Sequence, residues 1–314
     1  MAEQETSEQG VEAPYRSGFV AIVGRPNVGK STLLNRLVGE RVAITSPKPQ
    51  TTRDRIKGIL TDDSHQAVFV DTPGIHEASS RLHRYMVNLA VGTLSESDLV
   101  LMVIDAERFV GRLEDEVAQI GSILEALSES GTSSVLVLNK IDRVKDRRLL
   151  LPVMEALTAL HPFQHMVPVS AKGGDGVEEL GALTCSMLPE GSPLFPEDDF
   201  TDRSLRFLAA ETIREPLFMQ LRQEIPYHVA VGIDAWEEKD EVVVIHATIH
   251  VARSSQKGIV IGKGGSRLKA VGQSARRGLE RLLDRRVFLD LRVRVEPRWT
   301  ERPDGLRKLG YDEG

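Results

Sequence analysis

Five short apolar runs dominate the first 190 residues, and each of them ends in polar residues or a glycine loop. They are Phe19–Val23, Val68–Val70, Leu99–Ile104, Val135–Leu138 and Met166–Val169. Helical stretches lie between them, such as Lys30–Leu37, Arg81–Leu94 and Leu113–Leu127. Buried strands that alternate with helices predict a mostly parallel sheet with helices on both faces. Ligands of such sheets bind beyond the carboxyl ends of the strands, so we expect the functional residues there.

The loop after the first run has the pattern GxxxxGKS. It reads Gly24-Arg25-Pro26-Asn27-Val28-Gly29-Lys30-Ser31, and it lies between a predicted strand and a predicted helix. Glycines there allow backbone N–H groups to point inward at an anion, and the helix N-terminus adds its dipole. We expect Lys30 to reach the β- and γ-phosphates of a nucleotide and the Ser31 hydroxyl to bind Mg²⁺.

Asn139-Lys140-Ile141-Asp142 follows the fourth run and favours guanine over adenine. The Asp142 carboxylate can only accept hydrogen bonds, and guanine offers adjacent donors at N1 and N2 where adenine does not. We expect Asn139 to tie this loop to the phosphate loop and Lys140 to lie along the base. A backbone N–H of Ser170-Ala171-Lys172, after the fifth run, is expected at the guanine carbonyl.

Two further segments are expected around the phosphates. In Asp71-Thr72-Pro73-Gly74, Asp71 is expected to hold Mg²⁺ through a water and the Gly74 amide to sense the γ-phosphate. In the polar loop Gln50-Thr51-Thr52-Arg53, one threonine is expected to bind Mg²⁺ only when the γ-phosphate is present. The sequence favours Thr52 but leaves Thr51 open.

Charge is unevenly distributed along the chain. The formal net charge is −6, yet Val251–Trp299 carries 13 Lys or Arg against 4 Asp or Glu. A basic stretch on an acidic chain indicates a surface for a polyanion, although a merely solvated surface remains the alternative.

The element order changes after a Pro-rich acidic stretch near residues 191–203. A helix over Ser204–Gln223, strands over Val229–Ala235 and Glu241–Val251, a glycine loop, a helix through Leu283 and a strand over Val287–Val295 predict a small α+β unit. We therefore divide the chain into a flexible tail (1–17), an α/β nucleotide-binding domain (18–190), a linker (191–203), an α+β domain (204–299) and a C-terminal tail (300–314).

Within the basic stretch, Gly262-Lys263-Gly264-Gly265 fits the GxxG loop with which a KH domain clamps single-stranded RNA. Lys263 is expected to supply charge to a phosphate, and Arg267 and Lys269 to extend the positive surface. Ile259 and Ile261 are expected to give an apolar floor for the bases. An ordinary tight turn is the alternative.

The motif set resembles that of translation-factor-class GTPases, and a GTPase domain followed by a KH domain is similar to the bacterial Era family. The resemblance implies GTP hydrolysis, binding of small-subunit ribosomal RNA and assembly of the 30S subunit, with no DNA partner. It also implies a loose association with the inner face of the cell membrane, for which we find no amphipathic stretch.

Two positions bear on catalysis. Ile75 stands where Ras-like GTPases carry a glutamine that orients water, and an isoleucine cannot do this. By resemblance to the TrmE–Era–Der branch, Asn27 helps to hold a potassium ion that supplies positive charge in place of an arginine finger. A purely structural Asn27 is the alternative.

The predicted sites can be stated together. For catalysis we predict Asn27, Thr52 and Gly74, and for metals Ser31, Thr52 and Asp71 (Mg²⁺) and Asn27 (K⁺). The predicted GTP-binding residues are Gly24, Asn27, Val28, Gly29, Lys30, Ser31, Thr32, Asp71, Gly74, Asn139, Lys140, Asp142, Ser170, Ala171 and Lys172. The predicted RNA-binding residues are Gly262, Lys263, Gly264, Gly265, Arg267 and Lys269.

Other classes of protein fit less well. A metabolic P-loop kinase or ATPase is disfavoured by Asp142, and an RNA-binding module with a purely structural nucleotide site is disfavoured by Lys30, Ser31 and Asp71. The acidic N-terminus does not resemble a signal peptide, and one cysteine (Cys185) cannot form an internal disulfide, so we expect a cytoplasmic protein.

Overall fold

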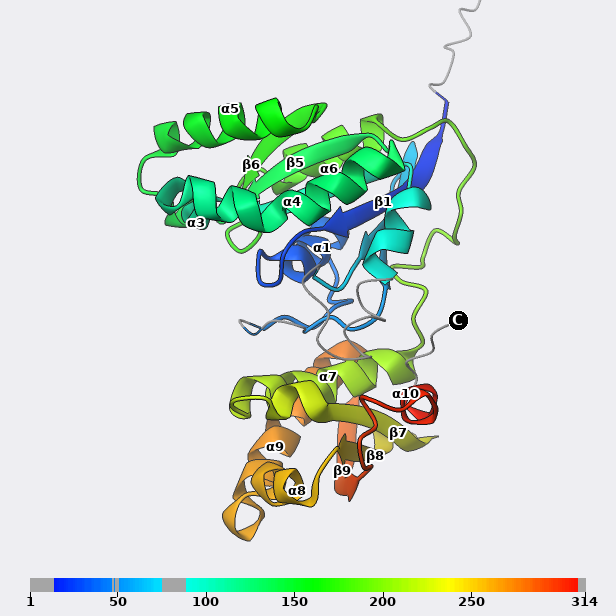
Figure 1. Cartoon of the computed structure of the whole chain (residues 1–314). Helices are drawn as coiled ribbons and strands as arrows, with labels where there is room; N and C mark the ends of the chain where they lie inside the picture. Colours follow the sequence, from blue (N-terminus) through cyan, green and yellow to red (C-terminus); the bar gives the residue numbers. More distant parts are fainter. Residues whose placement is uncertain (1–13, 47, 49–50, 75–88, 310–314) are drawn as a thin grey trace, which may run out of the picture.

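A computed structural model describes residues 14–46, 48, 51–74 and 89–309. It shows two domains, with the sheet of the first above and the helices and strands of the second below (Figure 1). The segment from α6 to α7, residues 187–204, runs down one side of the molecule and joins them.

The first domain is a six-stranded sheet in the order β2-β3-β1-β4-β5-β6, with helices on both faces. All neighbours are parallel except β2 and β3. Its elements in chain order are β1 (Arg16–Val23), α1 (Lys30–Val38), β2 (Ile56–Thr61), β3 (His65–Asp71), β4 (Leu99–Asp105), α3 (Ala106–Gly111), α4 (Leu113–Ser130), β5 (Ser134–Asn139), α5 (Leu150–Leu160), β6 (His165–Val169) and α6 (Val177–Ser186). The prediction of a mostly parallel sheet with helices on both faces is confirmed.

Strands β4 and β5 are apolar along most of their length because both faces of the sheet are buried there. On β1, Val20 and Ile22 pack with α1 and α6, whereas Ala21 and Val23 pack with α4 and α5 on the other face. This packing holds the carboxyl ends of β1, β3, β4 and β5 at one edge, where the phosphate loop and Asp71, Asp105 and Asn139 lie.

Strand β2 is not among the predicted strands, because its residues lack a continuous apolar run. It lies at the edge of the sheet, and the linker covers its outer side: the Ile59 amide donates to the Phe200 carbonyl (2.9 Å). The Thr201 hydroxyl donates to the Lys57 carbonyl (2.6 Å). The linker is therefore fixed to the first domain along this edge.

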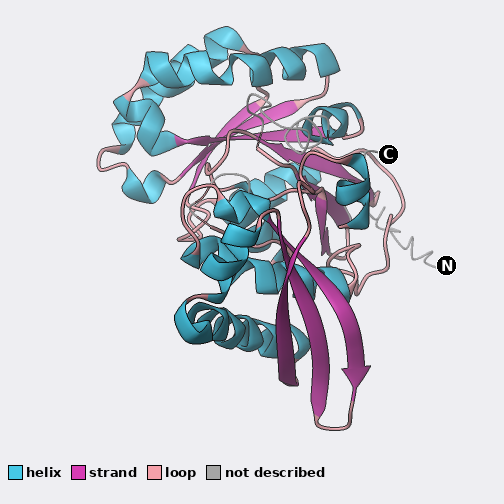
Figure 2. Cartoon of the chain, turned by 60° about the horizontal axis from the view of Figure 1, so that its bottom comes forward, coloured by secondary structure: helices cyan, strands magenta, loops and turns pink. Residues whose placement is uncertain are grey.

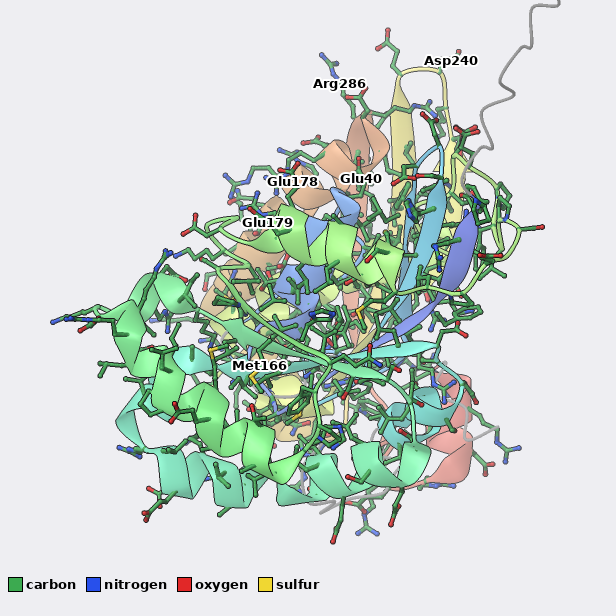
Figure 3. All side chains as sticks on the ribbon, turned by 90° about the horizontal axis from the view of Figure 1, so that it is seen from above. Glu40, Met166, Glu178, Glu179, Asp240 and Arg286 are labelled. Carbon is green, nitrogen blue, oxygen red and sulfur yellow. The ribbon has the colours of Figure 1, made fainter. Side chains whose placement is uncertain are left out.

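The second domain is a three-stranded sheet, β7-β8-β9, covered by helices on one face (Figure 2). Strands β7 and β8 are antiparallel, and β8 and β9 are parallel. Its elements are α7 (Leu205–Gln220), β7 (Val229–Glu238), β8 (Val242–Val251), α8 (Ser254–Ile261), α9 (Ser266–Leu283), β9 (Arg286–Val295) and α10 (Pro303–Lys308). The turn at Asp240 and the start of β9 at Arg286 lie at the same end of this sheet (Figure 3).

The predicted alternation on β9 is confirmed. Val287, Leu289 and Leu291 pack against the helices, whereas Phe288 lies on the opposite face and is exposed. Ser204 caps α7 by accepting a hydrogen bond from the Phe207 amide (3.3 Å), and the helix continues through Pro216.

Some expected bounds differ from the structure. Strand β1 begins at Arg16, inside the segment predicted as a tail, and α10 lies inside 300–314 with Leu306 buried beside Trp299. The run Gly258–Ile261 is the end of helix α8. Most of the expected helix Arg81–Leu94 lies outside the described residues. Its described part, from Leu89 to Leu94, is helical. Within the described part of the chain, no helix combines the length and apolar character needed to cross a bilayer.

Candidate functional site

The phosphate loop, which joins β1 to α1, contains two positions whose backbone conformation and close surroundings favour glycine. Gly24 and Gly29 have φ of 146° and 106°. A Cβ on Gly24 would lie 2.3 Å from the Val103 carbonyl oxygen, and one on Gly29 would lie 2.3 Å from Asn139 Nδ2. Helix α1 begins at Lys30, directly after the loop, so its N-terminus is aimed at the loop's interior.

Lys30 is buried in this loop. Its Nζ donates to the carbonyl oxygens of Gly24 (3.1 Å) and Arg25 (3.2 Å). Burial lowers the pKa of Lys30 to about 8, although the Asp71 carboxylate opposes this shift. A lysine held in this way is prepared to bind a multiply charged phosphate, which would compensate for the cost of burying its charge.

Three oxygen-bearing side chains converge beside Lys30. Ser31 Oγ donates to Asp71 Oδ2 (2.6 Å), Thr52 Oγ1 donates to the same oxygen (3.1 Å), and the two hydroxyls are 2.9 Å apart. Burial raises the pKa of Asp71, against the effect of Lys30 and the two hydroxyls. Asp71 Oδ1 is buried and has no hydrogen-bond partner among the described residues.

Thr51 takes no part in this cluster. Its hydroxyl donates to the Lys48 carbonyl (2.8 Å) and lies 2.7 Å from Ser46 Oγ. Of the two threonines that the sequence left open, only Thr52 thus lies beside Ser31 and Asp71.

Gly74 packs against the phosphate loop. A Cβ there would lie 2.7 Å from the backbone nitrogen of Pro26, so a larger residue would push the two segments apart. Ile75, which follows Gly74, and Gln50, which precedes Thr51, lie outside the described residues.

Asn139 joins the loop Asn139–Asp142, here called the base loop, to its neighbours. Its Nδ2 donates to the Val28 carbonyl (2.7 Å), and its Oδ1 accepts from the amides of Lys140 (2.8 Å) and Ala171 (2.9 Å). This one buried side chain therefore connects the three segments predicted from the sequence: the phosphate loop, the base loop and the Ser170–Lys172 segment.

Asp142 and Lys140 are held by other polar residues of the site. The Ser170 hydroxyl donates to Asp142 Oδ1 (2.7 Å), which fixes the carboxylate and leaves its other oxygen for a ligand. Lys140 Nζ donates to the Asn27 carbonyl (2.6 Å) and to Asp105 Oδ2 (2.6 Å). The sequence marks Asp105 only as the polar end of a strand, and its pairing with Lys140 was not foreseen.

Many of these groups line two neighbouring hollows. A cavity of about 820 Å³ is lined by Asn27, Gly29, Thr32, Asn139, Lys140, Asp142, Ala171 and Lys172, together with Thr45, Ser46 and, from helix α7, Met219. A second, smaller pocket beside Lys30, Ser31 and Thr52 includes Gly74. The structure therefore brings every predicted nucleotide residue to one edge of the sheet, although the contact with α7 was not predicted.

The second domain carries a groove between α9 and β9. A cavity of about 410 Å³ is lined by Gly265, Leu268, Lys269, Gly272, Gln273, Arg276, Leu289 and Leu291. The groove has an apolar floor of leucines with basic side chains beside it. Ile259 and Ile261, expected as the floor, are not among the lining residues, because their run belongs to helix α8.

The glycine loop lies at one end of this groove. Gly262, Gly264 and Gly265 have positive φ, and the loop is a single turn between α8 and α9. Lys263 is exposed, whereas the Arg267 guanidinium donates back to the Ile259 carbonyl. A Cβ on Gly264 or Gly265 would enter open space, so only the backbone conformation and an approaching ligand restrict these positions.

Known proteins resemble the chain over nearly its whole length. The family model described as 50S ribosome-binding GTPase matches residues 19–140, and a KH domain model matches residues 224–300. GTPase Era of Geotalea uraniireducens is 49% identical over 302 residues, which is 96% of this chain and 99% of that protein.

Two solved structures have the same arrangement. A variant of Aquifex aeolicus Era bound to GDP and AlF₄⁻ has a TM-score of 0.88 and 41% identity, covering 95% of this chain and 99% of its own. Era in complex with MgGDPNP and nucleotides 1506–1542 of 16S ribosomal RNA gives the same values.

Proposed function

The chain belongs to the family of Era GTPases, and we propose that it is a GTP-hydrolysing switch whose second domain binds the 3′ part of small-subunit ribosomal RNA during 30S assembly. The observation that carries this proposal is the presence of both sites in one chain: the nucleotide cavity at the first sheet and the basic groove at the glycine loop. The ribosomal RNA in the solved Era complex is 16S, which supports the small subunit as the target.

The nucleotide site would select guanine through Asp142. Because the Ser170 hydroxyl donates to Asp142 Oδ1, the carboxylate is oriented before a ligand binds, and its two oxygens keep lone pairs for the adjacent N1 and N2 donors of guanine. Lys140, held by Asp105, would lie beside the base, and the backbone of Ala171, fixed by Asn139, would meet its carbonyl. Each of these groups is positioned before a ligand arrives, which reduces the entropy lost on binding.

The cluster of Ser31, Thr52 and Asp71 fits Mg²⁺. Hydroxyl and carboxylate oxygens are the donors that Mg²⁺ prefers, and the unpartnered Oδ1 of Asp71 leaves this carboxylate with bonding capacity. When bound, the ion would neutralise charge on the β- and γ-phosphates. The protein's part is to hold Ser31 and Thr52 at hydrogen-bond distance from Asp71, with Lys30 close by.

For catalysis we propose Asn27, Thr52 and Gly74. Gly74 packs against Pro26 of the phosphate loop, and both Gly74 and Thr52 line the smaller pocket, which supports a role for them at the γ-phosphate. Asn27 lines both cavities, and the family resemblance supports its role toward K⁺. Without a water-orienting side chain at Ile75, intrinsic hydrolysis should be slow.

For RNA we propose Gly262–Gly265, Arg267 and Lys269 as the contact surface, extended by Arg276 in the groove. The apolar floor suits stacked or packed bases, and the exposed Lys263 suits a phosphate. We place the protein in the cytoplasm, where ribosomal subunits are assembled. Peripheral contact with the membrane and the division into domains at residues 190 and 204 stay predictions.

The decisive experiment replaces Lys263 and Gly264 together with Asp. Negative charge and side chains would then stand where a phosphate strand must pass, so affinity for single-stranded RNA from the 3′ part of 16S should fall by a large factor. The salt dependence of binding should also become shallower, by somewhat under one unit of slope for each phosphate that the protein no longer neutralises.

GTP binding should be retained, because the altered residues lie in the other domain. Arg292 on the exposed face of β9 offers a matched control: Arg292→Asp removes a basic residue of the same domain outside the groove lining. If the double variant bound RNA with unchanged affinity and salt slope, the groove would not be the RNA site.

A further inference from the structure

The loop that carries Thr52 is held by the second domain. Arg53, 3% exposed, donates to the carbonyl oxygens of Val229 (2.7 Å) and Pro226 (2.9 Å). Its guanidinium lies 5.4 Å from the ring of Phe218 and 5.7 Å from the ring of Trp299. An arginine of the nucleotide-binding domain is thus buried inside the KH domain.

The residue before Thr52 is held in the same way. Arg214 of α7, 1% exposed, donates to the Thr51 carbonyl (2.5 Å) and lies over the same Phe218 ring at 4.8 Å. Lys48, earlier in the loop, donates to the carbonyls of Phe218 and Leu221 at the end of α7. Contacts from α7 and the turn after it therefore fix the loop.

Thr52 lies between these anchors and faces the other way. Its hydroxyl contacts Ser31 and Asp71 in the nucleotide-binding domain, whereas its neighbour Arg53 enters the second domain. A threonine on an unanchored loop would have to lose the freedom of that loop each time it bound a metal, and anchoring removes much of this cost in advance.

We propose that Arg53 is a positioning residue for GTP hydrolysis: it docks the loop against Phe218 and Trp299 of the KH domain, and so holds the Thr52 hydroxyl beside Ser31 and Asp71. The KH domain is then a structural part of the GTPase site as well as an RNA-binding unit. This inference rests on the proposed role of Thr52 toward Mg²⁺.

Burial makes the position of Arg53 specific. A guanidinium withdrawn from water is tolerated only where its donors are satisfied, and here two backbone carbonyls and two aromatic faces receive it. Lysine keeps the charge but lacks the planar guanidinium that lies beside both rings while it donates to two carbonyls, and an apolar residue would retain packing but lose both hydrogen bonds.

The test uses the full-length chain and the variants Arg53→Met and Arg53→Lys. Residues that orient metal ligands typically contribute roughly 10- to 100-fold to metal affinity or activity. We expect Arg53→Met to lower kcat by that order, to raise the Mg²⁺ concentration needed for half-maximal rate and to weaken binding of a non-hydrolysable GTP analogue. GDP affinity should stay unchanged, because Thr52 acts only when the γ-phosphate is present. Arg53→Lys should recover part of the rate.

Arg55→Met is the matched control. Arg55 lies two residues further on, and its side chain contacts Glu96 and the Leu89 carbonyl of its own domain. The Arg55→Met variant should hydrolyse GTP at the rate of the unsubstituted protein and with the same Mg²⁺ dependence. If Arg53→Met failed to fold by circular dichroism, Phe218→Leu would remove the shared ring from the other side and should shift the Mg²⁺ dependence in the same direction.

Unchanged Mg²⁺ dependence in a folded Arg53→Met or Phe218→Leu variant would overturn the inference, as would an equal loss of GDP and GTP-analogue binding. Thr52→Ala separates this failure from a failure of the proposed function. If Thr52→Ala alone lowers the rate, the metal role stands and only the positioning by Arg53 is wrong. If Thr52→Ala leaves rate and Mg²⁺ dependence unchanged, the proposed metal role is itself wrong.

Discussion

The lowered pKa of Lys30 makes nucleotide affinity depend on pH in a defined direction. In the free protein burial lowers this pKa to about 8. Phosphate oxygens beside the ammonium would raise the pKa in the complex, because opposite charge favours the charged form. The charged lysine therefore binds more tightly, and a protein that has lost this proton must regain it on binding.

The size of the effect follows from this difference. Well below pH 8 Lys30 is already charged, so affinity should not vary on its account. Above pH 8 the charged fraction falls, and at about pH 9 only about one molecule in eleven carries the proton. Affinity should then be weaker by roughly tenfold, or about 1.4 kcal/mol, and should continue to fall until the pKa of the complex is reached.

The assay is a titration with a fluorescent GDP analogue at several values between about pH 7 and 9. Lys30→Met is the control, because it retains any titration of the nucleotide itself, including loss of the guanine N1 proton in alkaline solution. The variant should bind weakly and lack the additional slope. The reasoning about Lys30 would be refuted if the affinity of the unsubstituted protein changed with pH in the same way as that of the variant.

Two other predictions concern the base and the monovalent ion. Asp142→Asn should weaken GTP and improve xanthine nucleotide binding, because the amide can donate to the xanthine carbonyl; unchanged GTP affinity in a competition titration would show that Asp142 does not contact the base. Hydrolysis should be slow and faster in K⁺ than in Na⁺, and Asn27→Ala should remove that difference. Equal rates of the starting protein in the two salts would end the potassium hypothesis.

The nucleotide site was largely predictable because its residues stand at strand ends. Short apolar runs such as Val135–Leu138 favour buried strands, and parallel strands bring the residues that follow them, such as Asn139 and Asp71, to the same end of the sheet. Strand β2 was not predictable in this way because Ile56–Thr61 has a neighbouring strand on one side only and carries Lys57 and Gly58, which interrupt an apolar pattern.

Other features depend on contacts that no local pattern records. The choice between Thr51 and Thr52 depends on the path of a loop, which Arg214 and Val229 determine from more than 160 residues away. Helix α10 falls in a predicted tail because Leu306 is almost its only apolar residue, and this leucine is buried in a cluster with Ala230, Ala252 and Trp299 that is distant in sequence. The floor of the groove beside α9 comes partly from β9, far in sequence from the glycine loop.

The linker along β2 also affects self-association. An edge strand exposes unpaired N–H and C=O groups that can pair with the same strand of another molecule. Here Phe200 and Thr201 of the linker hydrogen-bond to the outer side of β2. The buried Gln66 side chain also holds the linker, because its oxygen accepts from the amides of Leu194 (2.6 Å) and Phe195 (2.8 Å). A fragment that ended at residue 190 would retain the phosphate loop, Asp71 and Asn139 and yet leave this edge open, so it should tend to aggregate through strand addition.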